Sequence, residues 1–297
     1  MNILLLGKDG QVGRELTKSL SDLGQLTALG RAQLDLSDIL KLEAILMQIK
    51  PHLIVNASAY TAVDKAESHP IEAYLINENV VAQLASYARQ QGAIFVHYST
   101  DYVFDGSKKG AYLENDEVNP LNVYGASKRA GEQAIVDSQC QGYIFRTSWV
   151  YSLHGANFIK TILNLAKQKD SLSIVSDQQG VPTSAELIAD VTLAAIRAIG
   201  RKKFTPGIYH LTPGGITTWY DLACYIVTQL LNKGIDLQLQ PFKIKPIVSD
   251  MYPLPAKRPQ NSLLNHSKLS TMLGVIMPDW HEHVDKFIIQ VIQKEFS

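Results

Sequence analysis

Residues 3–13, ILLLGKDGQVG, decide the fold. The short, continuous apolar run at the start is typical of a parallel strand that is buried on both faces. Gly7, Gly10 and Gly13 then form a G-x-x-G-x-x-G pattern between this strand and a predicted helix. Glycine is required where a turn needs a positive φ angle and where the backbone must approach a pyrophosphate. The stretch therefore predicts a β-α-β unit that binds a nucleotide at the start of its helix.

The same alternation of apolar patterns continues through the first half of the chain. Further strands are predicted at 26–29, 53–55, 94–98 and 143–146. Helices are predicted between them at 39–49, at about 80–88 and at about 121–136. Such alternation predicts an α/β fold, a Rossmann-type doubly wound parallel sheet with helices on both faces.

The second half loses this regularity. Helices are predicted at 157–168, 184–199, 218–232 and 280–294, with short strands and a proline-rich stretch, 241–259, between them. We therefore assign residues 1–150 to an NAD(P)-binding Rossmann domain and 151–297 mainly to a smaller α/β substrate-binding region. The chain is expected to return to the sheet near 170–200, first through a strand at 172–175.

Composition excludes several classes of function. The chain has 297 residues, 46% of them hydrophobic, and 28 basic and 28 acidic residues give a formal net charge of zero. This balance lacks the basic field that a nucleic-acid partner needs. No apolar run approaches a membrane span, and the opening run is too short for a signal peptide. Cys140 and Cys224 have no metal-ligand spacing, so we expect reduced thiols in a cytoplasmic protein.

The end of the second strand bears on the choice of coenzyme. An acidic side chain there would bind the ribose 2′-hydroxyl of NAD, but this strand ends Leu29-Gly30-Arg31. Arg31 could hold the 2′-phosphate of NADP through a charge-assisted contact. NADPH is therefore the expected coenzyme, with NADH as an alternative. Arg31 as an ordinary exposed arginine remains the alternative interpretation.

A tyrosine and a lysine one helical turn apart suggest chemistry at the sheet edge. Tyr124 and Lys128 would lie on the same face of the helix predicted at about 121–136. Alone, such a pair usually belongs to a solvated helix face. Here the preceding strand ends in Ser99-Thr100-Asp101, at the carboxyl edge where α/β sheets bind ligands.

Four longer stretches carry a family resemblance. They are HYSTDYVF at 97–104, PLNVYG at 120–125, FRTSWVY at 145–151 and RPQNSLLN at 258–265. With the glycine loop and the Tyr/Lys pair, they resemble the extended short-chain dehydrogenase/reductase superfamily and, within it, the family of dTDP-4-dehydrorhamnose reductases. The resemblance runs in order from Met1 to the C-terminus.

The resemblance implies an activity and a catalytic set. The activity is reduction of the 4-keto group of dTDP-4-dehydro-6-deoxy-L-mannose to dTDP-L-rhamnose, the last step of dTDP-L-rhamnose synthesis. Thr100, Tyr124 and Lys128 match the catalytic positions. A tyrosine with a pKa of about 10 can give the product alkoxide its proton, and a nearby ammonium should lower that pKa. Lys128 would also bind the nicotinamide ribose, and Thr100 would bind the substrate oxygen.

Other positions are implied by the same resemblance. The expected cofactor-binding residues are Gly7, Gly10, Gln11, Val12, Gly13, Arg31, Asp35, Leu36, Ala57, Ala59, Thr61, Tyr124 and Lys128. The expected substrate-binding residues are Thr100, Asp101, Tyr124, Trp149, Arg258 and Asn261. Alternatives remain for three of these: Asp35 as a helix cap, Trp149 as core packing, and Arg258 in a surface salt bridge.

Some reductases of this type form homodimers around magnesium. Glu15 and Glu186 match two of the metal positions, and Glu295 matches a third approximately. A surface glutamate is the alternative for each. A homodimer with a possible Mg²⁺ at its interface is the corresponding expectation.

Two other functions remain open. The first is another nucleotide-sugar epimerase or dehydratase of the superfamily, although dehydratases tend to carry Asp-Glu after the strand-end threonine and this chain has Asp101-Tyr102. The second is a non-catalytic NADP-binding regulatory subunit, against which the complete Thr/Tyr/Lys set weighs. Net consumption of free NADPH would separate the reductase from both.

Overall fold

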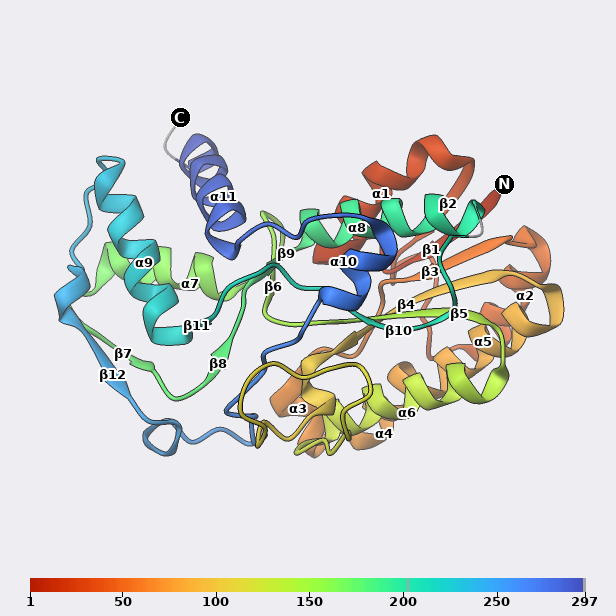
Figure 1. The fold of residues 1–297 in the computed structure, drawn as a ribbon, viewed down its shortest axis with the longest axis horizontal. Helices are drawn as coiled ribbons and strands as arrows, with labels where there is room; N and C mark the ends of the chain where they lie inside the picture. Colours follow the sequence, from red (N-terminus) through yellow and green to blue (C-terminus); the bar gives the residue numbers. More distant parts are fainter. Residues whose placement is uncertain (202, 296–297) are drawn as a thin grey trace.

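A parallel β-sheet forms the centre of the structure, a computed structural model that describes residues 1–201 and 203–295 (Figure 1). Within these residues the sheet has six strands in the order β10-β5-β4-β3-β1-β2, and each neighbouring pair is parallel. The strands are β1 (Asn2–Leu6), β2 (Gln25–Leu29), β3 (Leu53–Asn56), β4 (Ile94–Thr100), β5 (Gln141–Thr147) and β10 (Gly207–His210). The predicted doubly wound fold is confirmed.

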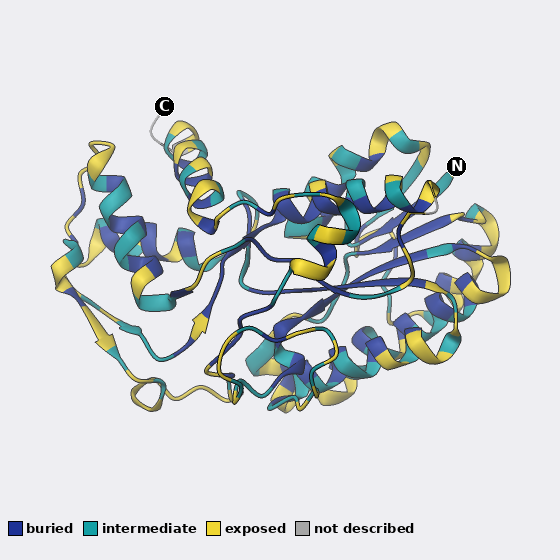
Figure 2. Ribbon diagram, in the orientation of Figure 1, coloured by how far each residue is buried: buried dark blue, intermediate teal, exposed yellow. Residues whose placement is uncertain are grey.

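Helices cover both faces of this sheet, which explains its continuous apolar strands. On one face lie α1 (Gln11–Leu20), α8 (Ala185–Gly200) and α10 (Ser267–Leu273), whose apolar side chains share a core with β1, β3 and β5. On the other lie α2 (Ile39–Ile49), α5 (Val80–Gln91) and α6 (Val123–Ser138). Figure 2 shows the central strands of the sheet buried between the two layers.

Short helical segments connect these elements. They are η1 (Ser21–Leu23), α3 (Val63–Ser68), α4 (Pro70–Tyr74), the π-helical turn η2 (Leu75–Asn79) and η3 (Asp101–Val103). The polar loops after β1, β3, β4 and β5 all leave the sheet at its carboxyl edge, because the strands are parallel. Loops from distant parts of the sequence therefore meet there.

A second unit packs beside this edge. It contains α7 (Phe158–Gln168), α9 (Trp219–Asn232) and α11 (Trp280–Glu295), together with η4 (Pro241–Lys243) and η5 (Ser249–Met251). Two small sheets pair β7 (Leu172–Val175) with β12 (Ile244–Ile247) and β8 (Gln179–Gly180) with β11 (Thr217–Thr218). Its helices enclose a separate apolar core. β6 (Val150–Tyr151) pairs with β9 (Thr183–Ser184) where the two units meet.

The chain returns to the sheet within the expected range, through α8, but the strand expected to begin the return takes no part in it. The strand at 172–175 does not join the large sheet, because β7 pairs with β12 and packs against the core of the second unit. The return is made by α8, which packs on α1, and by β10, which pairs with β5. The stretch Leu172-Ser173-Ile174-Val175 predicts a strand, but it does not indicate which sheet the strand completes. No helix among the described residues is long and apolar enough to cross a membrane.

Candidate active site

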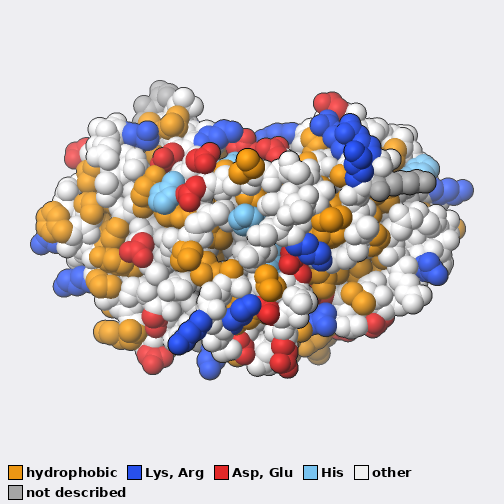
Figure 3. Space-filling model, viewed as in Figure 1, with side chains coloured by type: hydrophobic (Ala, Val, Ile, Leu, Met, Phe, Trp, Pro, Cys, Tyr) orange, Lys and Arg blue, Asp and Glu red, His pale blue; other side chains and the backbone are white. Residues whose placement is uncertain are grey.

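A cleft of about 1080 Å³ lies at the carboxyl edge of the sheet, between the two units. Its walls come from the loops after β1, β2, β3, β4 and β5, from the start of α6, and from Trp219 of the second unit. On the face of the molecule drawn in Figure 3, acidic and basic side chains are interspersed rather than gathered by sign.

The glycine loop is built for close backbone approach. Gly7 has a φ of +84°, and a Cβ atom on it would lie 2.8 Å from the backbone of Ala57. A Cβ atom on Gly13 would lie 2.0 Å from the carbonyl oxygen of Gly7. Helix α1 begins at Gln11 without a side-chain cap on its first N–H groups. A bare helix N-terminus behind a tight glycine turn is suited to an anionic diphosphate.

Unpaired buried atoms also indicate a polar ligand. Gln11 Oε1, Ser99 Oγ, Asp101 Oδ2 and Thr147 Oγ1 are buried and have no hydrogen-bond partner among the described residues, and all four residues line the cleft. Buried polar atoms normally have partners, so four such atoms around one cleft fit a ligand that supplies them. The residues present therefore fit a bound dinucleotide and a polar substrate.

The structure brings together nearly all the expected cofactor residues. Those that line the cleft are Gly7, Gly10, Gln11, Val12, Arg31, Asp35, Leu36, Ala57, Ala59, Thr61, Tyr124 and Lys128. Gly13 is outside the lining and packs directly behind Gly7. Asp35 does not cap helix α2, because Asp38 accepts the capping hydrogen bond from Lys41 N.

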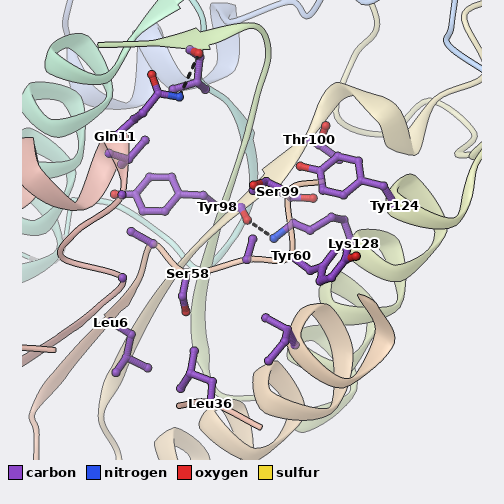
Figure 4. Close-up of a pocket in the computed structure, with 18 of the residues that line it drawn as sticks. Leu6, Gln11, Leu36, Ser58, Tyr60, Tyr98, Ser99, Thr100, Tyr124 and Lys128 are labelled. Carbon is purple, nitrogen blue, oxygen red and sulfur yellow. Dashed lines mark hydrogen bonds between the residues drawn. The ribbon is translucent and has the colours of Figure 1, made fainter. Parts of the chain in front are cut away.

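The expected catalytic residues lie on one wall of the cleft (Figure 4). Helix α6 starts with a hydrogen bond from Gly125 N to the side chain of Asn122, which places Tyr124 in its first turn and Lys128 in the next. Thr100 ends β4 beside them, and its hydroxyl donates to Asp101 Oδ1 at 2.9 Å. Burial raises the pKa of Tyr124 to about 12, and the nearby Asp101 acts in the same direction.

Lys128 is almost completely buried and is held from two sides. Its Nζ atom donates to the carbonyl oxygen of Tyr98 at 2.6 Å and lies 3.1 Å from His97 Nε2. Burial lowers the pKa of Lys128 to about 7. The hydrogen bonds of the described residues do not join this amine to the Tyr124 hydroxyl, so the lowered tyrosine pKa expected from the sequence is not found in this arrangement.

The partner of Lys128 has a defined tautomer. Ser58 N donates to Asn56 Oδ1 at 3.1 Å, which turns the Asn56 amide nitrogen toward His97 Nδ1 at 3.2 Å. Because an amide nitrogen only donates, Nδ1 must be the acceptor. Burial holds the pKa of His97 well below its usual value, so the ring is neutral and its proton is on Nε2, facing Lys128. Such a donor favours the neutral form of the amine.

A stacked aromatic pair also lines the cleft. Trp149 stacks on Trp219 with ring centroids 3.5 Å apart, and both line the cleft. Gly180 makes room for them, because a Cβ atom there would lie 2.5 Å from the Trp149 ring. Burial also raises the pKa of Asp101 to about 6. The lining of the cleft therefore combines a broad apolar surface with a carboxyl group that is readily protonated.

Two expected substrate residues lie outside the lining of the cleft. Arg258 makes a paired contact with Asp64 on α3, at 3.1 and 2.7 Å, and donates to Ala256 O. Asn261 donates to the carbonyl oxygens of Lys108 and Gly110, both at 2.7 Å. In this structure both residues fasten loops rather than face the cavity.

The expected magnesium site is not supported. Glu15 on α1 pairs with Lys18, and Glu186 on α8 pairs with Lys286. Across residues 1–201 and 203–295, no group of three or more His, Cys, Asp or Glu residues is arranged to hold a metal ion. The side chain of Glu295 lies outside the described residues.

Comparison with known proteins identifies the family. Residues 1–293 match the model of the family described as RmlD substrate binding domain. A dTDP-4-dehydrorhamnose reductase of Shigella flexneri is 46% identical over 292 residues, which cover 97% of each chain. The chain belongs to the dTDP-4-dehydrorhamnose reductase family.

Solved structures of the family agree with this assignment. A dTDP-4-dehydrorhamnose reductase from Clostridium acetobutylicum has a TM-score of 0.89 and 38% identity, and the match covers 99% of this chain and 100% of that one. One from Bacillus anthracis, solved in complex with NADP, has a TM-score of 0.87 and 31% identity, with 97% and 98% covered. Membership in this family makes the chain an oxidoreductase.

Several residues of the site are not predicted by the sequence patterns. Asn56 and His97 lie within buried strands, where a polar residue needs a partner, and that signal could have marked both. Trp219 begins a helix seventy residues after Trp149, and nothing local to either tryptophan predicts that they stack. Asp9 is marked by the sequence only as part of the glycine pattern.

Proposed function

We propose that this chain reduces the 4-keto group of dTDP-4-dehydro-6-deoxy-L-mannose to give dTDP-L-rhamnose, with NADPH as the reductant. The observation that carries the proposal is a full-length family match whose cleft holds Thr100, Tyr124 and Lys128 together. The acceptor sugar and the catalytic roles come from the family, and the donors in the cleft are suited to them.

The coenzyme would lie along the glycine loop and supply the hydride. The N–H groups at the start of α1 would bind its diphosphate, and Gly7, Gly10 and Gln11 would lie against it. Arg31 would approach the 2′-phosphate, and its side chain is free to move because it is 90% exposed. Lys128 would bind the nicotinamide ribose.

Tyr124 would donate the proton that the product oxygen needs. Its hydroxyl has a pKa raised to about 12 by burial, so it carries its proton at neutral pH and can deliver it to a more basic alkoxide. Thr100 is placed to donate a hydrogen bond to the same oxygen if its hydroxyl turns away from Asp101. Because the pKa of Lys128 is about 7, part of the amine is charged at neutral pH, and this ammonium form would stabilise the phenolate that remains.

The chain favours a reductase over the alternatives. Tyr102 follows Asp101, so the second carboxylate typical of dehydratases is missing from this position. A regulatory subunit would not need the Thr/Tyr/Lys set. Steady oxidation of free NADPH by the keto-sugar nucleotide distinguishes the reductase, because epimerases and dehydratases regenerate the coenzyme that they hold.

The test is Tyr124→Phe, followed by absorbance at 340 nm and by coenzyme binding. Turnover should fall at least about 100-fold while the coenzyme still binds, since the variant loses a proton donor and keeps the ring. Tyr143→Phe is the matched control, because Tyr143 is buried outside the cleft and donates to Phe204 O. Turnover by Tyr124→Phe close to that of the unmodified protein would exclude the assigned role.

A further inference from the structure

The carboxylate of Asp9 lies at the end of β2, where the strand itself has no acidic residue. A Cβ atom built on Gly30 would lie 1.7 Å from Asp9 Oδ2 and 2.8 Å from Asp9 Cγ. The Asp9 side chain, from the glycine loop, thus fills the space that a side chain at position 30 would take. Both residues line the cleft, beside Arg31. In dinucleotide-binding folds this is the corner that meets the adenosine ribose.

The charges at this corner are balanced rather than positive. Asp9 Oδ1 lies 3.1 Å from Lys8 Nζ. Arg31 is 90% exposed, and its Nε atom lies 3.7 Å from Asp35 Oδ2. A hydrogen bond from the backbone of Ser37 keeps the pKa of Asp35 below its ordinary value. Two cations therefore face two carboxylates, and a 2′-phosphate would meet as much repulsion as attraction from these four side chains.

We propose that Asp9 determines coenzyme choice in opposition to Arg31. The carboxylate accepts a hydrogen bond from a free ribose 2′-hydroxyl, as in NADH, and repels the 2′-phosphate of NADPH. This inference rests on the proposed function, since it concerns the coenzyme of the same cleft. It replaces a choice made by Arg31 alone with a balance between Arg31 and Asp9 at this corner of the cleft.

Asp9→Asn tests this directly, because it removes the charge and keeps the size of the side chain beside Gly30. Dissociation constants for NADPH and NADH are measured by the fluorescence of the bound reduced nicotinamide, which needs no turnover. The ratio of NADPH to NADH affinity should rise about tenfold, because the variant no longer repels the 2′-phosphate and binds the 2′-hydroxyl less strongly. Added salt should reduce the effect.

Two further variants sharpen the result. Gly30→Ala places a methyl group against Asp9 and should move its carboxylate away. The variant should therefore also raise the ratio of NADPH to NADH affinity. The double variant Asp9→Asn/Gly30→Ala should raise this ratio little beyond the value for Asp9→Asn alone. Asp22→Asn is the matched control, because Asp22 is an exposed acid of η1 outside the cleft and the change in net charge is the same. This control should leave the ratio within about twofold.

The outcomes separate the inference from the proposed function. If both coenzymes bind and Asp9→Asn leaves their ratio unchanged, the role of Asp9 is overturned while the reductase proposal stands. If neither coenzyme binds the unmodified protein, the proposed function itself fails. A tenfold rise in Asp9→Asn with an unchanged Asp22→Asn supports the inference.

Discussion

Glu132→Gln should destabilise the protein strongly, because Glu132 and Arg146 form an ion pair inside the core. Arg146 Nε and Nη2 donate to the two carboxylate oxygens of Glu132 at 2.8 and 2.7 Å, and both residues are buried. Arg146 Nη1 has no hydrogen-bond partner among the described residues, so the carboxylate is the main compensation for a buried charge. Breaking such a pair from one side costs about 3–5 kcal/mol.

The cost can be measured by urea unfolding and by thermal melting. For a chain of this size it corresponds to a fall in Tm of roughly 6–10 °C. Glu117→Gln makes the same chemical change on an exposed residue and should stay within about 0.5 kcal/mol. The double variant Glu132→Leu/Arg146→Met should recover most of the loss, because it removes the buried Arg146 charge together with its partner. A cost below about 1 kcal/mol for Glu132→Gln would refute this reasoning.

Two further predictions concern titration and tautomers in the cleft. In protein labelled with ¹⁵N-histidine, NMR should show His97 with its proton on Nε2. Asn56→Asp should move this proton to Nδ1, because the carboxylate accepts a hydrogen bond where the amide donated one. An Nδ1 proton in the unmodified protein would contradict the hydrogen-bond assignment. Asp101 has a pKa raised to about 6, so between about pH 4 and 6 the folded state keeps a proton that the unfolded state has lost, and stability falls as the pH rises through this window. Asp101→Asn should lose that pH dependence and should be more stable than the unmodified protein at pH 7, by at most about 3 kcal/mol. If the unfolding free energies of the variant and the unmodified protein change equally with pH between pH 4 and 7, the pKa of Asp101 is not raised.

Much of the fold could be predicted because its signals are local. Buried parallel strands give short apolar runs, and long helices give 3.6-residue periods, so β1 to β5 and the longer helices between them could be placed within a few residues. The short helices α3 and α4 were not predicted. The partner of β7 could not be predicted, because Leu172 and Ile174 are equally suited to either sheet. The decision depends on β12, which lies more than seventy residues later.

The site also contains residues that local sequence signals predict and residues that only the tertiary structure places. The glycine loop and the Tyr124/Lys128 helix carry their function in residue spacing, and the structure places them around one cleft. Asp9 and Arg258 could not be placed from the sequence, since their partners, Gly30 and Asp64, are set by the tertiary fold. The homodimer and the cytoplasmic location remain predictions.

The late return of α8 and β10 has a consequence for biosynthesis. As the chain leaves the ribosome, β5 has no outer neighbour and α1 lacks the helix α8 that packs on it until residues 185–210 have been made. By then α7 and β7 have been synthesised, but β7 still lacks β12. Each unit is completed only by a segment that is synthesised after part of the other unit. We therefore expect that neither unit can finish folding during translation before part of the other has been made.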